Sequence, residues 1–176
     1  MIYNYSLGIF FALLNTILFI WSIFKKDKKE MIKIQSVGQI FVAISNFFLY
    51  SYSAVITCII NALRNYLTYK GKLSKNITII FFMFYIIFGL AVNSRGLIGI
   101  FPIMSACTYL IFCFISNNAQ TLRCGLIVNQ NMALVHDIFI KAYPSVITEV
   151  LVIIISIYNI LKFNKKNEHN ETNIYN

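Results

Sequence analysis

The sequence is poor in charged residues and has no paired cysteine motif, and each shortage excludes a class of protein. Charged residues make up 12% of the 176 positions and hydrophobic residues 59%. Soluble domains carry about 25% charged and about 45–50% apolar residues, so a water-soluble fold is excluded. The four cysteines form no CxxC pair and predict neither a disulfide framework nor a metal site.

The chain also lacks the residue patterns of enzymes and nucleic-acid-binding proteins. No nucleophile with an adjacent base and no glycine-rich phosphate loop is recognisable, so we expect neither an enzyme nor a cofactor. The formal net charge is +9, but the basic residues fall at the ends of apolar segments rather than along one face. This distribution argues against a nucleic-acid partner. The expected partners are the lipid bilayer and an unknown small polar solute.

The two halves of the chain resemble each other at an offset of 91 residues. From residue 8 to residue 57, eleven of fifty positions are identical to the residue 91 places later, among them Gly8-Ile9-Phe10 and Gln39. The aligned blocks are hydrophobic and of helix length, so the repeat predicts a duplicated helical bundle. Internal repeats are frequent in transporters, where the substrate site lies between the two halves.

Seven apolar segments are long enough to approach the ~20 residues that a membrane-spanning helix needs. They cover about Ser6–Phe24, Met31–Tyr50, Ala54–Tyr69, Asn76–Val92, Gly99–Ser116, Leu122–Ile140 and Ser145–Phe163. We predict an all-α integral membrane protein with seven transmembrane helices. Two parallel three-helix repeats, residues 1–70 and 97–163, are joined by a linker helix in residues 71–96. Residues 164–176 form a polar cytoplasmic tail that we expect to be disordered.

The basic residues predict the orientation of this bundle. With the N-terminus outside, thirteen Lys and Arg residues fall on the cytoplasmic side and two, Arg95 and Lys141, fall on the outer side. Cytoplasmic loops of membrane proteins carry the excess of Lys and Arg. We therefore predict a multi-pass protein with its N-terminus outside and its C-terminus in the cytoplasm.

Polar side chains inside the predicted spans are candidate binding residues, because a bilayer disfavours them. Gln39 and Asn46 share a helix face, and their repeat equivalents Gln130 and Asp137 have the same spacing. A polar position present in both halves is expected to face the axis between them. The predicted substrate-binding residues are Gln39, Asn46, Asn61, Gln130, Asp137 and Asn159. The alternative is that these side chains hold neighbouring helices together by hydrogen bonds.

Further polar residues suggest coupling and hydration. His136, Asp137 and Glu149 lie near the predicted outer end of the second repeat. They are candidates for proton coupling, because His titrates near neutrality; the alternative is that they are simply hydrated at the interface. The run Asn129-Gln130-Asn131 indicates a water-filled cavity or a local unwinding of its helix. Arg64 is expected to extend to the inner membrane surface.

Two stretches, Lys33–Asn65 and Asp137–Ile160, resemble the YgjV family of bacterial inner-membrane proteins. The first combines a glutamine-bearing helix, a tight turn and a helix with an Ala-Leu-Arg-Asn sequence. At greater distance, the arrangement resembles SWEET, semiSWEET and PnuC transporters. The resemblance implies a bacterial inner (plasma) membrane location, a SWEET-like architecture and solute transport. One departure is that only Pro102 lies inside a predicted helix, whereas SWEET-type repeats carry more hinge prolines.

The function that we expect is small-solute transport by alternating access between the two repeats. The alternative is a non-transporting membrane scaffold or accessory subunit, in which the polar stripes are helix or subunit contacts. Seven helices in one chain already supply both repeats, so a homo-oligomer is allowed but not required.

Overall fold

The computed structural model describes residues 2–49, 52–93, 96–139, 141 and 143–172. Over these ranges the chain forms seven helices and no strand. They are α1 (Ile2–Ile23), α2 (Lys28–Phe48), α3 (Tyr52–Tyr69), α4 (Lys75–Val92), α5 (Ile100–Ile115), α6 (Ala119–Phe139) and α7 (Tyr143–Thr172). The predicted all-helical class is confirmed.

Four of the described helices contain a segment long and apolar enough to cross a membrane. These segments are Ser6–Ile23, Lys28–Phe48, Lys75–Val92 and Ser145–Phe163, and α5 is a shorter apolar helix. Their large apolar side chains are exposed on the surface of the bundle, for example Ile17 on α1 and Ile80 on α4. Several polar side chains, by contrast, are buried inside it. A bundle with an apolar surface and buried polar groups is suited to lipid rather than to water.

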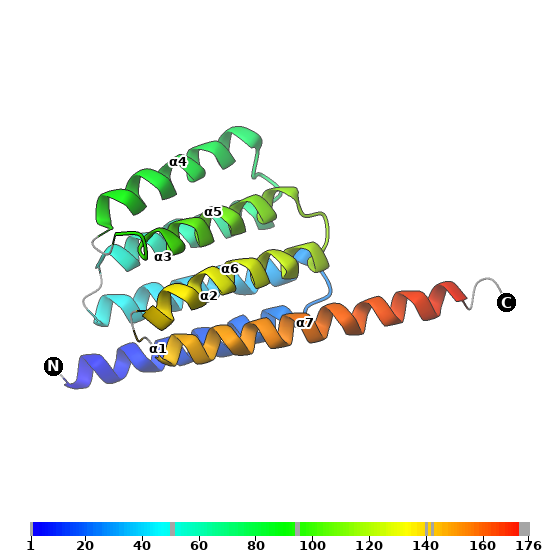
Figure 1. Cartoon of the computed structure of the whole chain (residues 1–176), viewed down its shortest axis with the longest axis horizontal. Helices are drawn as coiled ribbons and strands as arrows, with labels where there is room; N and C mark the ends of the chain where they lie inside the picture. The colour runs from blue at the N-terminus through cyan, green and yellow to red at the C-terminus, as the bar shows by residue number, and fades with distance from the viewer. Residues whose placement is uncertain (1, 50–51, 94–95, 140, 142, 173–176) are drawn as a thin grey trace.

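The helices form two layers. Figure 1 shows α1, α2 and α3 in the rear layer and α7, α6 and α5 in front of them, with α4 at the edge beside α5. Within the layers, α2 packs against α1 and α3, and α6 packs against α5 and α7. Between the layers, α1 contacts α7, α2 contacts α6 and α3 contacts α5. The space between the layers is therefore bounded by helices from both halves of the chain.

Local sequence signals set the helix boundaries. Asp27 precedes α2 and its carboxylate accepts a hydrogen bond from the backbone N–H of Glu30 at 3.1 Å. Ser74 precedes α4, where its Oγ accepts from the N–H of Ile77 at 3.4 Å. Side chains of this kind satisfy backbone donors that have no partner in the first turn. Gly71, at φ 66°, provides the left-handed residue in the turn between α3 and α4.

The end of α7 differs from the prediction. The helix continues to Thr172, into the polar segment that was expected to be disordered. No glycine or proline follows Phe163 to end the helix, and lysine and glutamate are good helix formers. Residues 173–176 lie outside the described part of the chain.

Candidate functional site

The main cavity lies between the two layers and has a volume of about 370 Å³. Its wall includes residues from α1, α2 and α3 on one side and from α5, α6 and α7 on the other. The polar residues in this wall are Gln35, Gln39, Thr57, Asn61, Arg64, Asn65, Ser105, Tyr109, Asn129, Gln130, His136, Asp137 and Glu149. A concave site with many convergent polar groups is the usual form of a small-molecule site.

Four of the six predicted substrate-binding residues line this cavity: Gln39, Asn61, Gln130 and Asp137. Gln39 on α2 and Gln130 on α6 are 91 residues apart, the offset of the predicted repeat, and these two helices contact each other. Neither side chain makes a hydrogen bond within the described residues, so both amides are available to a ligand.

The other two predicted residues lie elsewhere. The Nδ2 of Asn46 is 3.7 Å from the Sγ of Cys58, and this contact joins α2 to α3. Asn159 is buried in α7, where its Nδ2 donates to the backbone oxygen of Ile155 at 2.9 Å. Neither residue is part of the cavity wall.

The three residues predicted for proton coupling come together at one end of the cavity. The Nδ1 of His136 lies 2.7 Å from the Oδ1 of Asp137. Glu149, on α7, is buried and its carboxyl group interacts with that of Asp137. The Oε2 of Glu149 has no hydrogen-bond partner among the described residues. The cluster therefore places two carboxyl groups and an imidazole beside the same cavity.

The polar run in α6 contributes to the wall without breaking the helix. α6 is continuous from Ala119 to Phe139, so the predicted unwinding is wrong. Asn129 is held by Ser105 of α5, with its Nδ2 2.7 Å from Oγ and 2.9 Å from the backbone oxygen. Asn131 faces away from the cavity, is exposed, and donates to the backbone oxygen of Ile127.

Arg64 is the main residue that the sequence reasoning misplaced. It does not extend to the membrane surface but is 3% exposed and lines the cavity. Its Nε and Nη2 donate to the Oδ1 of Asn65 at 3.2 and 2.9 Å. Its Nη1 donates to the hydroxyl of Tyr85 at 3.4 Å, and its guanidinium carbon lies 4.9 Å from the ring centre of Tyr109. A sequence signal existed, because Arg64 lies more than one turn before the end of α3 at Tyr69.

Hydrogen bonds between helices hold the aromatic partners of Arg64 in place. The hydroxyl of Tyr85, on α4, donates to the Oδ1 of Asn61 at 2.6 Å. The hydroxyl of Tyr109, on α5, donates to the Oε1 of Gln35 on α2. The Nε2 of Gln35 in turn donates to the Oγ of Ser22 on α1 at 3.3 Å. Together with Arg64, these contacts connect helices α1 to α5 around the cavity wall and order its polar groups.

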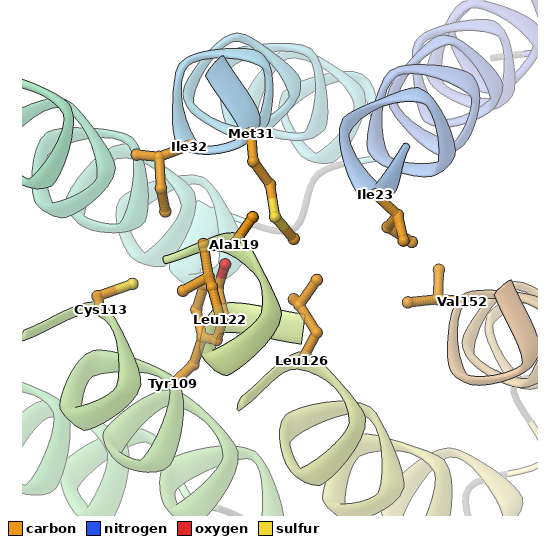
Figure 2. Close-up of a cluster of buried hydrophobic side chains, with 9 residues drawn as sticks. All are labelled: Ile23, Met31, Ile32, Tyr109, Cys113, Ala119, Leu122, Leu126 and Val152. Atoms are coloured by element: carbon orange, nitrogen blue, oxygen red, sulfur yellow. The ribbon is translucent and has the colours of Figure 1, made fainter. Parts of the chain in front are cut away.

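Beyond Tyr109, the cavity ends at a cluster of buried apolar side chains. Figure 2 shows side chains of five helices converging there: Ile23, Met31, Ile32, Tyr109, Cys113, Ala119, Leu122, Leu126 and Val152. They lie where α1 and α5 end and α2 and α6 begin. All are at most 5% exposed, so this end of the bundle is closed by tight packing.

Two basic side chains stabilise the same closed end through hydrogen bonds that join the two layers. On α2, the Nζ of Lys28 donates to the backbone oxygens of Cys113, at 3.0 Å, and Ser116 at the end of α5. On α6, the Nε of Arg123 donates to the backbone oxygen of Ile23 at 2.9 Å, and its Nη2 donates to that of Lys25 at the end of α1. Cations are favourable at helix C-termini, where carbonyl oxygens have no partner.

At the opposite end, the space continues into a second cavity of about 250 Å³. The two cavities share Thr57, Pro102 and His136. The second cavity extends from there to Asn93 and Gly99, beside the connection between α4 and α5. The polar space is therefore closed at one end of the bundle and extended toward the other.

Comparison with known proteins identifies the family. A family model described as bacterial inner membrane protein, Imp-YgjV, matches residues 6–167. This match covers most of the chain, and the protein belongs to that family. It is thus a membrane protein of a bacterial inner-membrane family. Neither a curated protein nor a solved structure matches the chain.

Proposed function

We propose that this member of the bacterial inner-membrane family is a small-solute transporter that works by alternating access. The observation that carries the proposal is the polar cavity between the two helical layers, closed at one end and extended toward the other. A transporter needs a polar site that opens to one side of the membrane at a time. The proposed role is not enzymatic and requires no cofactor.

The pattern of helix contacts supports the proposed division into two parallel repeats joined by α4. In this division, α1, α2 and α3 correspond in order to α5, α6 and α7. If the two repeats exchange places, the contact between α1 and α7 becomes a contact between α5 and α3. Both contacts exist, and the contact of α2 with α6 maps onto itself. Such pairing is expected for two repeats related by an axis along the membrane normal, which passes between Gln39 and Gln130.

The proposed orientation has the N-terminus outside and the C-terminus in the cytoplasm. Of the thirteen basic residues assigned to the cytoplasmic side, Arg64 and Arg123 are buried and have structural contacts. Removing them leaves eleven basic residues against two, so the asymmetry persists. The end fastened by Lys28 and Arg123 is then the cytoplasmic one, and the cavity faces outward.

Alternating access imposes an energetic condition on the closed end. The inward-facing state must separate the apolar cluster and break the bonds made by Lys28 and Arg123. A solute shifts this equilibrium only by its difference in affinity for the two states. The apolar cluster and the hydrogen bonds of Lys28 and Arg123 must therefore be strong enough to keep the cytoplasmic end closed and weak enough to break when the protein opens inward.

The test begins with thermal-shift measurements on the detergent-purified protein against sugars, nucleosides, vitamins and amino acids. A solute present at 100 times its Kd stabilises the protein by about 2.7 kcal/mol. Any stabilising solute is then tested for uptake into proteoliposomes. We expect the combined change Gln39→Ala and Asn61→Ala to abolish uptake without impairing membrane insertion.

A matched pair on α6 controls for general damage. Gln130→Ala removes an amide from the cavity wall, whereas Asn131→Ala removes the neighbouring amide, which is exposed and not part of that wall. We expect the first change to reduce uptake and the second to leave it unchanged. A stable protein that no solute stabilises, and that purifies with one constant partner, would instead support a scaffold or accessory subunit.

A further inference from the structure

Building on the transport function proposed above, we propose that the solute carries a carboxylate group and that Arg64 binds it. Arg64 is 3% exposed and lines the cavity. A buried charge is costly unless an opposite charge compensates it. The question is therefore what supplies the negative charge.

The described part of the protein supplies no anion to Arg64. The ion pair found among the described residues is His136 with Asp137, and it does not involve Arg64. The hydrogen-bond acceptors of Arg64 are a neutral amide oxygen of Asn65 and the hydroxyl of Tyr85. That hydroxyl already donates its proton to Asn61. Arg64 is thus oriented by neutral groups and by the face of the Tyr109 ring, and no anionic side chain among the described residues pairs with it.

Arg123 provides an internal comparison, because it is equally buried and also has no carboxylate partner. Its guanidinium binds two carbonyl oxygens at the end of α1 and the Oε1 of Gln120. The C-terminus of a helix carries partial negative charge, so the position of Arg123 is explained by the fold. Arg64 has no such helix end beside it among its partners, and it faces a cavity instead.

The guanidinium has the capacity for a ligand carboxylate. Of its five N–H groups, three are used in the bonds to Asn65 and Tyr85. One N–H on each terminal nitrogen remains. Two such groups can bind both oxygens of a carboxylate, the pairing for which the guanidinium geometry is suited.

The remainder of the cavity limits the ligand to one anionic group. Among the described residues that line it, Arg64 is the only Lys or Arg. His136 and Thr57 share the far end. Thr57 and Arg64 are seven positions apart in α3, which corresponds to a helix rise of about 10 Å. Asp137 and Glu149 belong to that far end and provide no positive charge for a second anion. They favour hydroxyl or amino groups on the ligand, and Gln39 and Gln130 lie free along the wall.

Matched acids and amides test this inference directly. The probes are acetate, lactate, N-acetylglycine, gluconate and benzoate, each compared with its primary amide in thermal-shift and binding measurements on the full-length protein. We expect stabilisation by acids and not by the corresponding amides. Arg64→Gln should raise the Kd of a bound acid about 10- to 100-fold, as expected for charge-assisted hydrogen bonds. Arg64→Lys should retain a preference for acids but a weaker one, because it keeps the positive charge and loses the planar pair of donors.

Lys70→Gln is the matched control, because it removes an exposed positive charge at the end of the same helix. It should leave the acid preference unchanged. If Arg64→Gln does not fold, the comparison of acids with amides on the unchanged protein and on Arg64→Lys still decides the question.

The outcomes separate this inference from the transport function. Uptake of neutral sugars or nucleosides with no acid preference would overturn the carboxylate inference and leave transport standing. Binding of acids that depends on Arg64, without uptake of any probe into proteoliposomes, would support the carboxylate site and contradict transport. Equal binding of acids and amides, or no binding of any acid, overturns the inference.

Discussion

Arg123→Ala should open the closed end of the bundle. Arg123 is 1% exposed and donates to the backbone oxygens of Ile23 and Lys25 across the two layers. A hydrogen bond to a charged group is worth about 1.5 kcal/mol at the low end of its range, so losing these two costs about 3 kcal/mol. Because 1.4 kcal/mol corresponds to a factor of ten, the ratio of closed to open molecules should fall roughly 100-fold.

A native cysteine reports this opening. Cys113 is 1% exposed within the apolar cluster that closes the end, and no hydrogen bond joins it to Arg123 among the described residues. We expect Arg123→Ala to accelerate maleimide labelling of Cys113 from the cytoplasmic side by up to roughly 100-fold, in proportion to the open population. Cys124, which is exposed, is replaced by serine to remove a competing thiol. Mass spectrometry then locates the label.

Two controls separate opening from damage. Lys33→Ala removes a nearby exposed charge and should leave the labelling of Cys113 unchanged. Cys58 is buried in α3 and should remain protected, because only global unfolding would expose both thiols. The reasoning would be refuted if Cys113 stayed protected in Arg123→Ala, or if Cys113 and Cys58 became reactive together.

Three further predictions concern orientation, packing and coupling. A fluorescent protein fused to the C-terminus should fluoresce in cells, because the proposed orientation has the C-terminus in the cytoplasm; a dark but full-length fusion would contradict this orientation. Gly125→Ala should destabilise the protein by about 1–3 kcal/mol, because a Cβ there would lie 2.4 Å from the Cβ of Phe112; the melting temperature should fall, while Cys124→Ala should leave it nearly unchanged. If Asp137 and Glu149 couple transport to protons, uptake should be stimulated by an acidic exterior, and Asp137→Asn or Glu149→Gln should remove that stimulation; a persisting response would exclude both carboxyl groups.

Local sequence patterns were sufficient to predict the helices. The apolar segment predicted at Asn76–Val92 is α4, found at Lys75–Val92. The start of α2 lies earlier than predicted, because Asp27 caps the helix within the charged cluster. These boundaries depend on a few neighbouring residues. For that reason they are visible without knowledge of the rest of the chain.

Part of the cavity wall was also predictable, because polar residues in a membrane span are few. The duplicated position Gln39 and Gln130 was found from the repeat, and both residues line the cavity. Asn46 has a similar sequence setting but contacts Cys58 instead. The side chain that faces the cavity depends on how each helix is rotated against its neighbours, and that rotation is set by packing across the bundle.

The sequence by itself determined that the protein is helical and embedded in a membrane, because the length of a hydrophobic segment is a property of consecutive residues. The tertiary structure alone decided that Arg64 faces a polar cavity beside Tyr109, and that Lys28 and Arg123 fasten helices of the other layer. These contacts join residues that are far apart in the chain. Their energies depend on burial and on the positions of partner atoms, which exist only after the two layers have packed together.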